Sequence, residues 1–309
     1  MAVTKIDKTL PNNSTTGYNY PVERCLADAK SVRDAIEITV LNYFRDQLGL
    51  SEEFCRERVS HEEQRTIPKS VLKELIDSGW DVQEKKVLDL GAGQGGMVLE
   101  LLEREADAYG VEPGIEFATL ARIRLKEQGH DPARVQVESG ESLSFRDNYF
   151  DYVISLQVLE HVRNPEAVLR EIFRVLQPGG RCYLSCENYL SFREPHYRVR
   201  WLPFLPKGLG AFYLRILGRD PTFLKKYVYY TTYPQIWRIC SRIGFKNVTY
   251  EHLVKKLDTP ARIRTWYLRE MAYLLRVLPK RICRRLVCGV EHMRNVLGPI
   301  VSVTLQKPF

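Results

Sequence analysis

The sequence has no apolar run as long as the roughly 18 residues that a membrane-spanning helix requires. Its first residues, MAVTKIDKTLPNNSTTG, also lack the apolar stretch of a secretory signal peptide. The seven cysteines are odd in number and scattered, without the paired spacing of a zinc site or a disulfide framework. These absences argue against an integral membrane protein and a secreted one, and they favour a cytoplasmic protein with reduced thiols.

The composition is that of a folded globular protein, with 44% hydrophobic and 11% aromatic residues in 309. This length corresponds to one large domain with additions, or to two domains. The net charge is +8, but acidic residues prevail in 1–180 and basic residues in 181–309. An anionic partner is therefore expected to meet the second half of the chain.

From Lys86 onward, short apolar strands alternate with stretches of helical spacing, as in a parallel sheet with helices on both faces. We therefore predict an α/β protein with a Rossmann-like sheet. Asn164 and Pro165 mark the start of one helix, because they fit its N-cap and first position. We predict four parts: an N-terminal extension and helical cap (1–80), a central core (81–186), an aromatic insertion (187–231) and the end of the core (232–309). The last part contains a basic helical insertion at 259–295.

A glycine-rich turn follows the first strand of the core, in VLDLGAGQGG (87–96). Such a turn lets a ligand approach the backbone and the N-terminus of the next helix. Gly91, Gly93 and Gly96 also satisfy the GxGxxG pattern of nicotinamide dehydrogenases, and Glu112 at the end of the next strand suits the ribose of either cofactor class. Asp89 separates the two classes, because a carboxylate beside the turn favours a cationic ligand group and repels a pyrophosphate.

The segments that follow are ESGESLSF (138–145), DYVISLQVLEHVRNP (151–165) and LREIFRVLQPGG (169–180). Together with the glycine turn they resemble the class I S-adenosylmethionine (SAM) dependent methyltransferases, particularly the type-11 group and the ubiquinone-biosynthesis O-methyltransferases. The resemblance is specific over 86–186 and looser over 232–251 and 298–307. It implies seven strands in the order 3214576 with the last antiparallel, the strand at 246–251 and the final strand forming a hairpin.

The resemblance also implies a set of cofactor contacts. Asp89 and the glycines of the turn would surround the methionine part of SAM, Glu112 would hold the ribose, and Gln157 would face the sulfonium. Ser139 stands where relatives often have Asp, which removes one expected contact to the adenine amine. We add Arg65 as a candidate partner of the SAM carboxylate. The expected cofactor-binding residues are Asp89, Gly91, Gly93, Gly95, Glu112, Gly140, Glu141, Ser142, Gln157 and Arg65.

Two histidines are candidate bases for removing a proton from the methyl acceptor, because histidine titrates near neutral pH. His161 follows the fourth strand and His196 lies in the aromatic insertion, so His161, His196 and Gln157 are the candidate catalytic residues. Each histidine could equally be a locally bonded structural residue. Some relatives bind a divalent metal through an ExxEH arrangement, and a magnesium site at Glu160, His161 and His196 stays open although Gln157 replaces the first glutamate.

The acceptor is expected to be a small molecule or a glycan hydroxyl, lipid-linked in one version of the hypothesis, and chosen by the 187–231 lid. The basic stretch 264–287 could pack on the core, lie on a membrane surface, or bind nucleic acid, the last being the least favoured because no nucleic-acid module accompanies it. N- or C-methylation of a small acceptor is the alternative activity. A SAM-binding scaffold without catalysis is the alternative from a different class.

Overall fold

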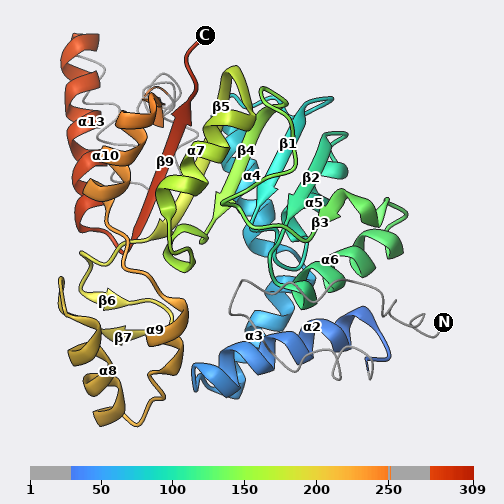
Figure 1. Cartoon of the computed structure of the whole chain (residues 1–309), viewed down its shortest axis with the longest axis vertical. Coiled ribbons are helices and arrows are strands. Elements are labelled where there is room, and N and C mark those ends of the chain that lie inside the picture. Colours follow the sequence, from blue (N-terminus) through green and yellow to red (C-terminus); the bar gives the residue numbers. More distant parts are fainter. Residues whose placement is uncertain (1–28, 250, 252–278) are drawn as a thin grey trace.

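The computed structural model describes residues 29–249, 251 and 279–309. A seven-stranded sheet forms its centre, in the order β3-β2-β1-β4-β5-β9-β8 (Figure 1). Strands β1 to β5 are parallel, and β9 is antiparallel to both β5 and β8. Since β8 and β9 are the sixth and seventh strands of this sheet, the predicted 3214576 order is confirmed. The strands are β1 (Lys86–Leu90), β2 (Asp107–Val111), β3 (Val135–Gln136), β4 (Phe150–Leu156), β5 (Leu176–Glu187), β8 (Lys246–Asn247) and β9 (Ile300–Gln306).

Helices cover both faces of the sheet, because its strands carry apolar side chains on both sides. Val87 belongs to the core under one group of helices, while its neighbour Leu88 belongs to the core under the other. Asn164 caps the helix that follows β4, accepting a hydrogen bond at Oδ1 from the N–H of Ala167 at 3.1 Å, as the sequence predicted. The first group is α4 (Thr66–Asp77), α5 (Gly96–Leu102) and α6 (Ile115–Glu127), and the second is α7 (Pro165–Val175) and α10 (Tyr233–Ile243).

The N-terminal cap is helical, as predicted, and consists of α2 (Val32–Val40), the π-helical segment η1 (Leu41–Gln47) and α3 (Glu52–Glu63). Its apolar residues form a separate small core that includes Leu120 of α6. The cap is thereby attached to the sheet through α6. In Figure 1 it lies below the sheet, at the end where the parallel strands finish.

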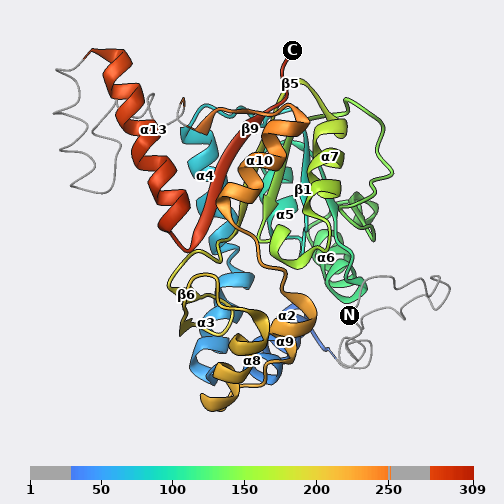
Figure 2. The ribbon, with the colours of Figure 1, turned by 60° about the vertical axis from the view of Figure 1, so that its left-hand side comes forward.

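The insertion 187–231 folds into a short hairpin and two helices. These are β6 (Arg193–Glu194), β7 (Val199–Arg200), α8 (Lys207–Ile216) and α9 (Thr222–Tyr227). Its buried aromatic residues share one hydrophobic core with Leu48 and Leu50 of the cap and with Tyr43 and Phe44. Figures 1 and 2 both show the insertion beside the cap at the carboxyl ends of the parallel strands. The cap and the insertion, more than 120 residues apart in sequence, therefore enclose this end of the sheet together.

The strand predicted over 246–251 is shorter than expected, because only β8 (Lys246–Asn247) pairs with β9. Beyond β8, the N–H of Thr304 in β9 donates its hydrogen bond to the side-chain hydroxyl of Thr249, at 2.7 Å, and not to a main-chain carbonyl. The predicted basic insertion at 259–295 and the helix at 264–287 fall largely outside the described residues. Their described end is α13 (Lys280–Leu297), which lies next to β9 and α10 (Figure 2).

Two further expectations concern the described part of the chain only. Five of the cysteines are free thiols: Cys55, Cys182, Cys186, Cys240 and Cys288. None of the described helices combines the length and the apolar content needed to cross a bilayer.

Candidate functional site

The glycine turn joins β1 to α5 at the carboxyl edge of the sheet. Gly91, Gly93 and Gly95 have φ values of +83°, +50° and +76°, which side chains with a Cβ rarely adopt. A Cβ at Gly91 would collide with Val158, whereas one at Gly93 would meet no atom within 4 Å. Gly91 is therefore required for packing against the segment after β4, while the backbone at Gly93 is open to a ligand.

Glu112, at the end of β2, holds this turn from the neighbouring strand. Its Oε2 accepts a hydrogen bond from the N–H of Gly93 at 2.9 Å, and its Oε1 accepts one from Gly114 at 2.8 Å. Burial raises the pKa of Glu112 to about 7, although the two backbone hydrogen bonds act in the opposite direction. Each carboxylate oxygen has a second lone pair, so Glu112 can still accept hydrogen bonds from two hydroxyls.

Asp89 is the second acid of this edge and is only 3% exposed. Burial, together with the charge of Glu112, raises its pKa to about 8. Asp89 makes no ion pair with any residue that the structure describes. A buried carboxyl group without a counter-charge is costly, so a cationic ligand beside Asp89 would be stabilised.

The loop after β3 lies next to the glycine turn. Gly140 packs against Leu90, since a Cβ on it would come within 3.1 Å of that side chain. Glu141 accepts a hydrogen bond at Oε1 from the N–H of Asn164 at 3.1 Å, and Ser142 donates its N–H to the carbonyl of Ser139 at 3.1 Å. The predicted adenine-capping segment is thus fixed beside the end of β1.

Arg65 lies near the turn but is bound to α5. Its Nε is 3.1 Å from Glu100 Oε1 and its Nη2 is 2.7 Å from Glu103 Oε1. Glu100 is 1% exposed and also pairs with Arg104 at 2.7 Å, so removing Arg65 would take away one of the counter-charges of this buried carboxylate. The contact of Arg65 with a cofactor carboxylate stays a prediction, and its guanidinium already binds two glutamates.

Gln157 directly follows β4 with a φ of +57°, a conformation that is strained for a residue with a side chain. Its side chain lies between two carboxylates, and only the amide nitrogen can donate to both. In that orientation the nitrogen donates to Glu187 Oε1 at 2.6 Å and to Glu160 Oε1 at 3.0 Å, and the oxygen accepts from Ser185 Oγ at 3.0 Å. Gln157 therefore positions two buried glutamates rather than pointing freely toward a ligand.

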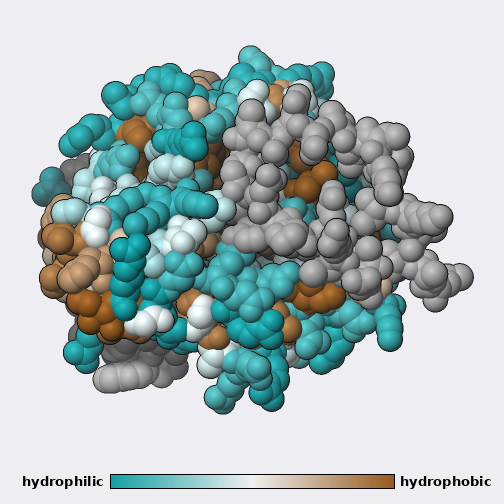
Figure 3. Space-filling model, turned by 60° about the horizontal axis from the view of Figure 1, so that its bottom comes forward, coloured by the Kyte–Doolittle hydropathy of each residue, from teal (hydrophilic) through white to brown (hydrophobic). Residues whose placement is uncertain are grey.

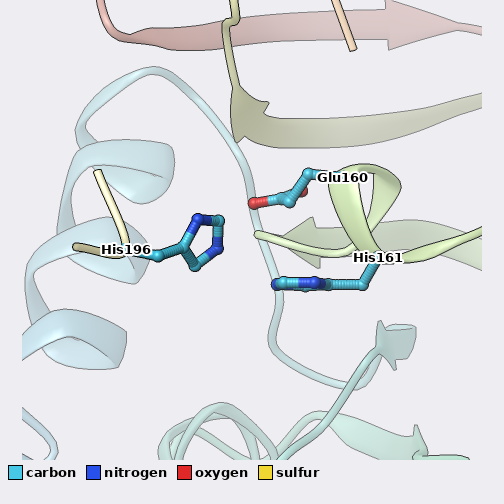
Figure 4. A group of neighbouring side chains, drawn as sticks. All are labelled: Glu160, His161 and His196. Atoms are coloured by element: carbon cyan, nitrogen blue, oxygen red, sulfur yellow. The ribbon is translucent and has the colours of Figure 1, made fainter. Parts of the chain in front are cut away.

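Glu160, His161 and His196 come together beyond Gln157, as Figure 4 shows. The first two lie in the short 3-10 helix η3 (Leu159–His161), and His196 comes from the insertion. One nitrogen or oxygen atom from each lies within 4.8 Å of the others, and the two imidazole centroids are 5.2 Å apart. The two candidate bases, which are 35 positions apart in sequence, therefore face one site.

A hydrogen bond at Nδ1 orients each imidazole. His161 donates from Nδ1 to the carbonyl of Tyr227 at 2.8 Å, and His196 Nδ1 is 3.0 Å from Glu194 Oε1. A carbonyl can only accept, so the proton of neutral His161 is on Nδ1 and its Nε2 carries the lone pair. Glu194 holds the second ring in the same way, which leaves both Nε2 atoms for a substrate or a metal.

The charges of this cluster are strongly perturbed. Burial, and next the charge of His196, lowers the pKa of His161 to about 3. For His196 burial lowers the pKa, but the hydrogen bond to Glu194 and the charges of Glu194, Glu160 and Glu187 outweigh it and the pKa is raised. Burial raises the pKa of Glu160 to about 7 and, with the charge of Glu160, that of Glu187 to about 8. His196 is therefore the stronger base of the two histidines.

Sequence reasoning missed Glu187 and Glu194. Both are buried, and Glu160 Oε2 and Glu187 Oε2 have no hydrogen-bond partner in the described part of the chain. Glu187 is the last residue of β5 and Glu112 directly follows β2, so the position of Glu187 at a strand end was a usable signal. Glu194 lies two residues before His196, but nothing in the sequence showed that its side chain turns inward.

Comparison with known proteins shows which family the core of this chain resembles. Residues 88–184 match the family described as "Methyltransferase domain". The chain is 35% identical over 114 residues to a ubiquinone biosynthesis O-methyltransferase of Aeromonas salmonicida, covering 37% of this chain and 48% of that protein. It is 30% identical over 154 residues to one of Pseudomonas entomophila, covering 50% of this chain and 62% of that protein. The chain thus spans about half to three fifths of the curated relatives it matches.

A solved structure shares the fold. It is that of a putative sarcosine dimethylglycine methyltransferase from Galdieria sulphuraria, with a TM-score of 0.50 and 16% sequence identity. The likeness covers 88% of this chain and 98% of the other. At this identity the similarity establishes the architecture and not the substrate.

Proposed function

Starting from the class I SAM-dependent methyltransferase domain that the core of this chain forms, we propose that the protein transfers a methyl group from SAM to a hydroxyl of a small molecule or glycan. One observation carries the proposal. The buried Asp89 and the half-buried Glu112 flank the open backbone of Gly93, and a pair of oriented histidines lies beyond Gln157 on the same edge of the sheet. A cofactor site and a proton-accepting site are thereby adjacent.

The chain fits SAM at the glycine turn. Asp89 would neutralise the ammonium group, the carboxylate of Glu112 would accept hydrogen bonds from the ribose hydroxyls, and the 140–142 loop would cover the adenine. SAM, when bound, supplies an electrophilic methyl group on a sulfonium. The protein's own contribution is to align the acceptor and to remove its proton.

We assign the proton acceptor to His196. Its Nδ1 is held by Glu194, so the ring orientation is fixed and Nε2 is directed at the shared site. The low pKa of His161 keeps it neutral, so its Nε2 would accept a hydrogen bond from a donor group of the acceptor other than the hydroxyl that His196 deprotonates. Both rings contact Phe223 of α9, which helps to exclude water.

The insertion 187–231 would choose the acceptor, because it supplies His196 and closes the carboxyl edge of the sheet. The names of the curated relatives favour O-methylation. The acceptor would be lipid-linked if the basic segment 264–287 contacts a membrane, because basic residues are attracted to anionic headgroups. Residues 264–278 of this segment lie outside the described chain. We propose peripheral localisation on that basis.

A divalent cation at Glu160, His161 and His196 is the second candidate for this site. The two free Nε2 atoms and the unpartnered Oε2 of Glu160 are suitable donors, and each histidine has the outer hydrogen bond typical of metal ligands. A bound cation would polarise the acceptor hydroxyl and so replace the general base. The neutral Gln157, which binds two carboxylates by donating to them, is the feature that disfavours it.

The deciding experiment is transfer of a labelled methyl group from SAM into fractionated metabolites, followed by mass spectrometry of the labelled product. A labelled ether or ester supports O-methylation, and a labelled amine or carbon supports the alternative activity. SAM binding without transfer to any fraction indicates a scaffold. Thermal stabilisation by NAD instead of SAM would overturn the assignment of the cofactor.

A further inference from the structure

The outer side of the insertion carries a contiguous set of exposed apolar side chains, which we call the lid face. Three of its members, Phe204, Phe192 and Ile216, are 78%, 69% and 66% exposed. Single exposed apolar residues are common, but a group of this size on one element marks an interaction surface. Figure 3 shows hydrophobic residues gathered on the side of the molecule where α8 lies. The lid face consists of Phe192, Leu202, Phe204, Leu209, Phe212 and Ile216.

Helix α8 shows why this surface is unusual. Its inner face is anchored by Gly210, where a Cβ would clash with Trp201, and by Leu214, which is fully buried. Leu209, Phe212 and Ile216 follow at helical spacing on the opposite side and are each at least 58% exposed. Helix α8 therefore has one apolar face toward the core and a second apolar face toward the outside.

The hairpin joins the remaining members to α8. The carbonyl of Phe192 accepts a hydrogen bond from the N–H of Trp201 at 2.9 Å, which brings Phe192 next to the segment that carries Leu202 and Phe204. That segment leads directly into α8. The lid face is therefore one surface and not a set of separated side chains.

Basic residues surround the lid face. Arg193 and Arg200 are paired across the β6–β7 hairpin, and Arg215 precedes Ile216 on α8. The acidic residues of the insertion are Glu187 and Glu194, which are buried, and Asp220, which is exposed. The exposed cations of the insertion that form no ion pair within the described residues and no ring contact with the cap are Arg193, Arg200, Arg215, Lys225 and Lys226.

We propose that the lid face docks onto the surface of an anionic lipid bilayer. Aromatic and aliphatic side chains would enter the interfacial layer, and the surrounding cations would contact acidic headgroups. A second copy of the chain fits less well, because a symmetric interface would place these unpaired cations against each other. The proposal does not depend on methyl transfer, so either can fail without the other.

Flotation of the full-length protein with lipid vesicles tests the docking. We expect it to float with vesicles of phosphatidylcholine and phosphatidylglycerol but not with phosphatidylcholine alone, and to be released as salt is raised. The double variant Phe204→Ser, Phe212→Ser should bind at least about tenfold more weakly, because two partly inserted rings are lost. The matched control Ile67→Ser, Val137→Ser removes two exposed apolar residues from outside the insertion and should bind normally.

Two outcomes would overturn the proposal. One is vesicle binding that the Phe204→Ser, Phe212→Ser variant retains in full, which would assign any membrane contact to another segment. The other is a dimer in light scattering that this variant dissociates, together with no vesicle binding by the unmodified protein. Unchanged far-ultraviolet circular dichroism and melting temperature of the variant confirm that its fold is intact.

Discussion

The N–H of Gly93 donates a hydrogen bond to the carboxylate of Glu112 at 2.9 Å, although the two residues are 19 positions apart. The bond links the turn after β1 to the end of β2. Parallel pairing places Leu90 opposite Val111, so the two strands finish at the same level and their following residues meet. The same carboxylate is the proposed partner of the SAM ribose.

Replacing Glu112 should therefore weaken SAM binding more than it changes the fold. We expect Glu112→Ala to raise the dissociation constant by about 10- to 100-fold, because charge-assisted hydrogen bonds are lost. Glu112→Gln keeps one acceptor oxygen, so its dissociation constant for SAM should lie between those of the unmodified protein and of Glu112→Ala. Isothermal titration calorimetry measures both, and equal affinity of Glu112→Ala and the unmodified protein would contradict the ribose assignment.

The affinity for SAM should rise with pH. Asp89 and Glu112 have pKa values raised from 3.8 and 4.5 to about 8 and about 7, so both are partly protonated near neutrality. A cationic ligand and hydroxyl donors favour the ionised forms, so binding should release protons. Calorimetry at pH 6 and pH 8 in buffers of different ionisation enthalpy checks this, and proton uptake on binding at pH 6 would refute it.

The same pair should influence the ligand-free protein in the opposite direction. Because the folded-state pKa values are raised, these acids favour the folded state fully below about pH 4, and that contribution is lost progressively until the pH has passed the folded-state values of about 7 and about 8. The stabilisation that SAM gives should therefore be larger at pH 8 than at pH 6. Melting curves with and without SAM at the two pH values measure it, with NAD as the control ligand.

Two glycines of one turn should respond differently to alanine. Gly91→Ala places a Cβ against Val158 as well as in a strained backbone, and should lower the free energy of unfolding by about 1–3 kcal/mol. Gly93→Ala meets no atom within 4 Å, so it should cost only the backbone strain of about 1–2 kcal/mol while reducing SAM affinity. Denaturant unfolding and calorimetry separate the effects, and an equal stability loss in both variants would show that backbone strain alone governs the turn.

Removing the proposed base should lower turnover without lowering SAM affinity. We expect His196→Asn to reduce kcat by about 10²- to 10⁴-fold, and Glu194→Gln to act in the same direction through the orientation of the ring. His130→Asn, in the loop after α6, is the matched control and should behave as the unmodified protein. Full activity of His196→Asn on the identified acceptor would assign the base elsewhere.

Removal of divalent metal should leave turnover intact. Gln157 stands where relatives with a metal have a carboxylate ligand. Its amide donates hydrogen bonds to Glu160 and Glu187, so these two glutamates are stabilised without a bound cation. Activity should persist after dialysis against EDTA and should not increase when Mg²⁺, Mn²⁺ or Zn²⁺ is added. Loss of activity in EDTA with recovery on adding one of these ions would instead establish the metal-assisted mechanism.

Local patterns determined much of the fold. The alternation of strands and helices predicted the sheet, and Asn164 with Pro165 predicted the start of α7, because capping depends on neighbouring residues. The glycine turn and Glu112 were predicted for a similar reason. Neighbouring strands of a parallel sheet end at the same edge. The residues that directly follow them therefore lie close together, regardless of the side chains in the rest of the chain.

The sequence suggested Glu160, His161 and His196 as a candidate site, but only the tertiary structure added Glu187 and Glu194 to it and formed the lid face. Glu160, Glu187 and Glu194 come from three different segments, and their burial together depends on how the insertion folds back on the sheet. The insertion in turn shares its core with the N-terminal cap, so its outward and inward sides are set by contacts that no local pattern contains. The sequence by itself determined the sheet and the candidate cofactor edge, whereas packing between distant segments determined which insertion residues are buried beside His196 and which are exposed around Phe204.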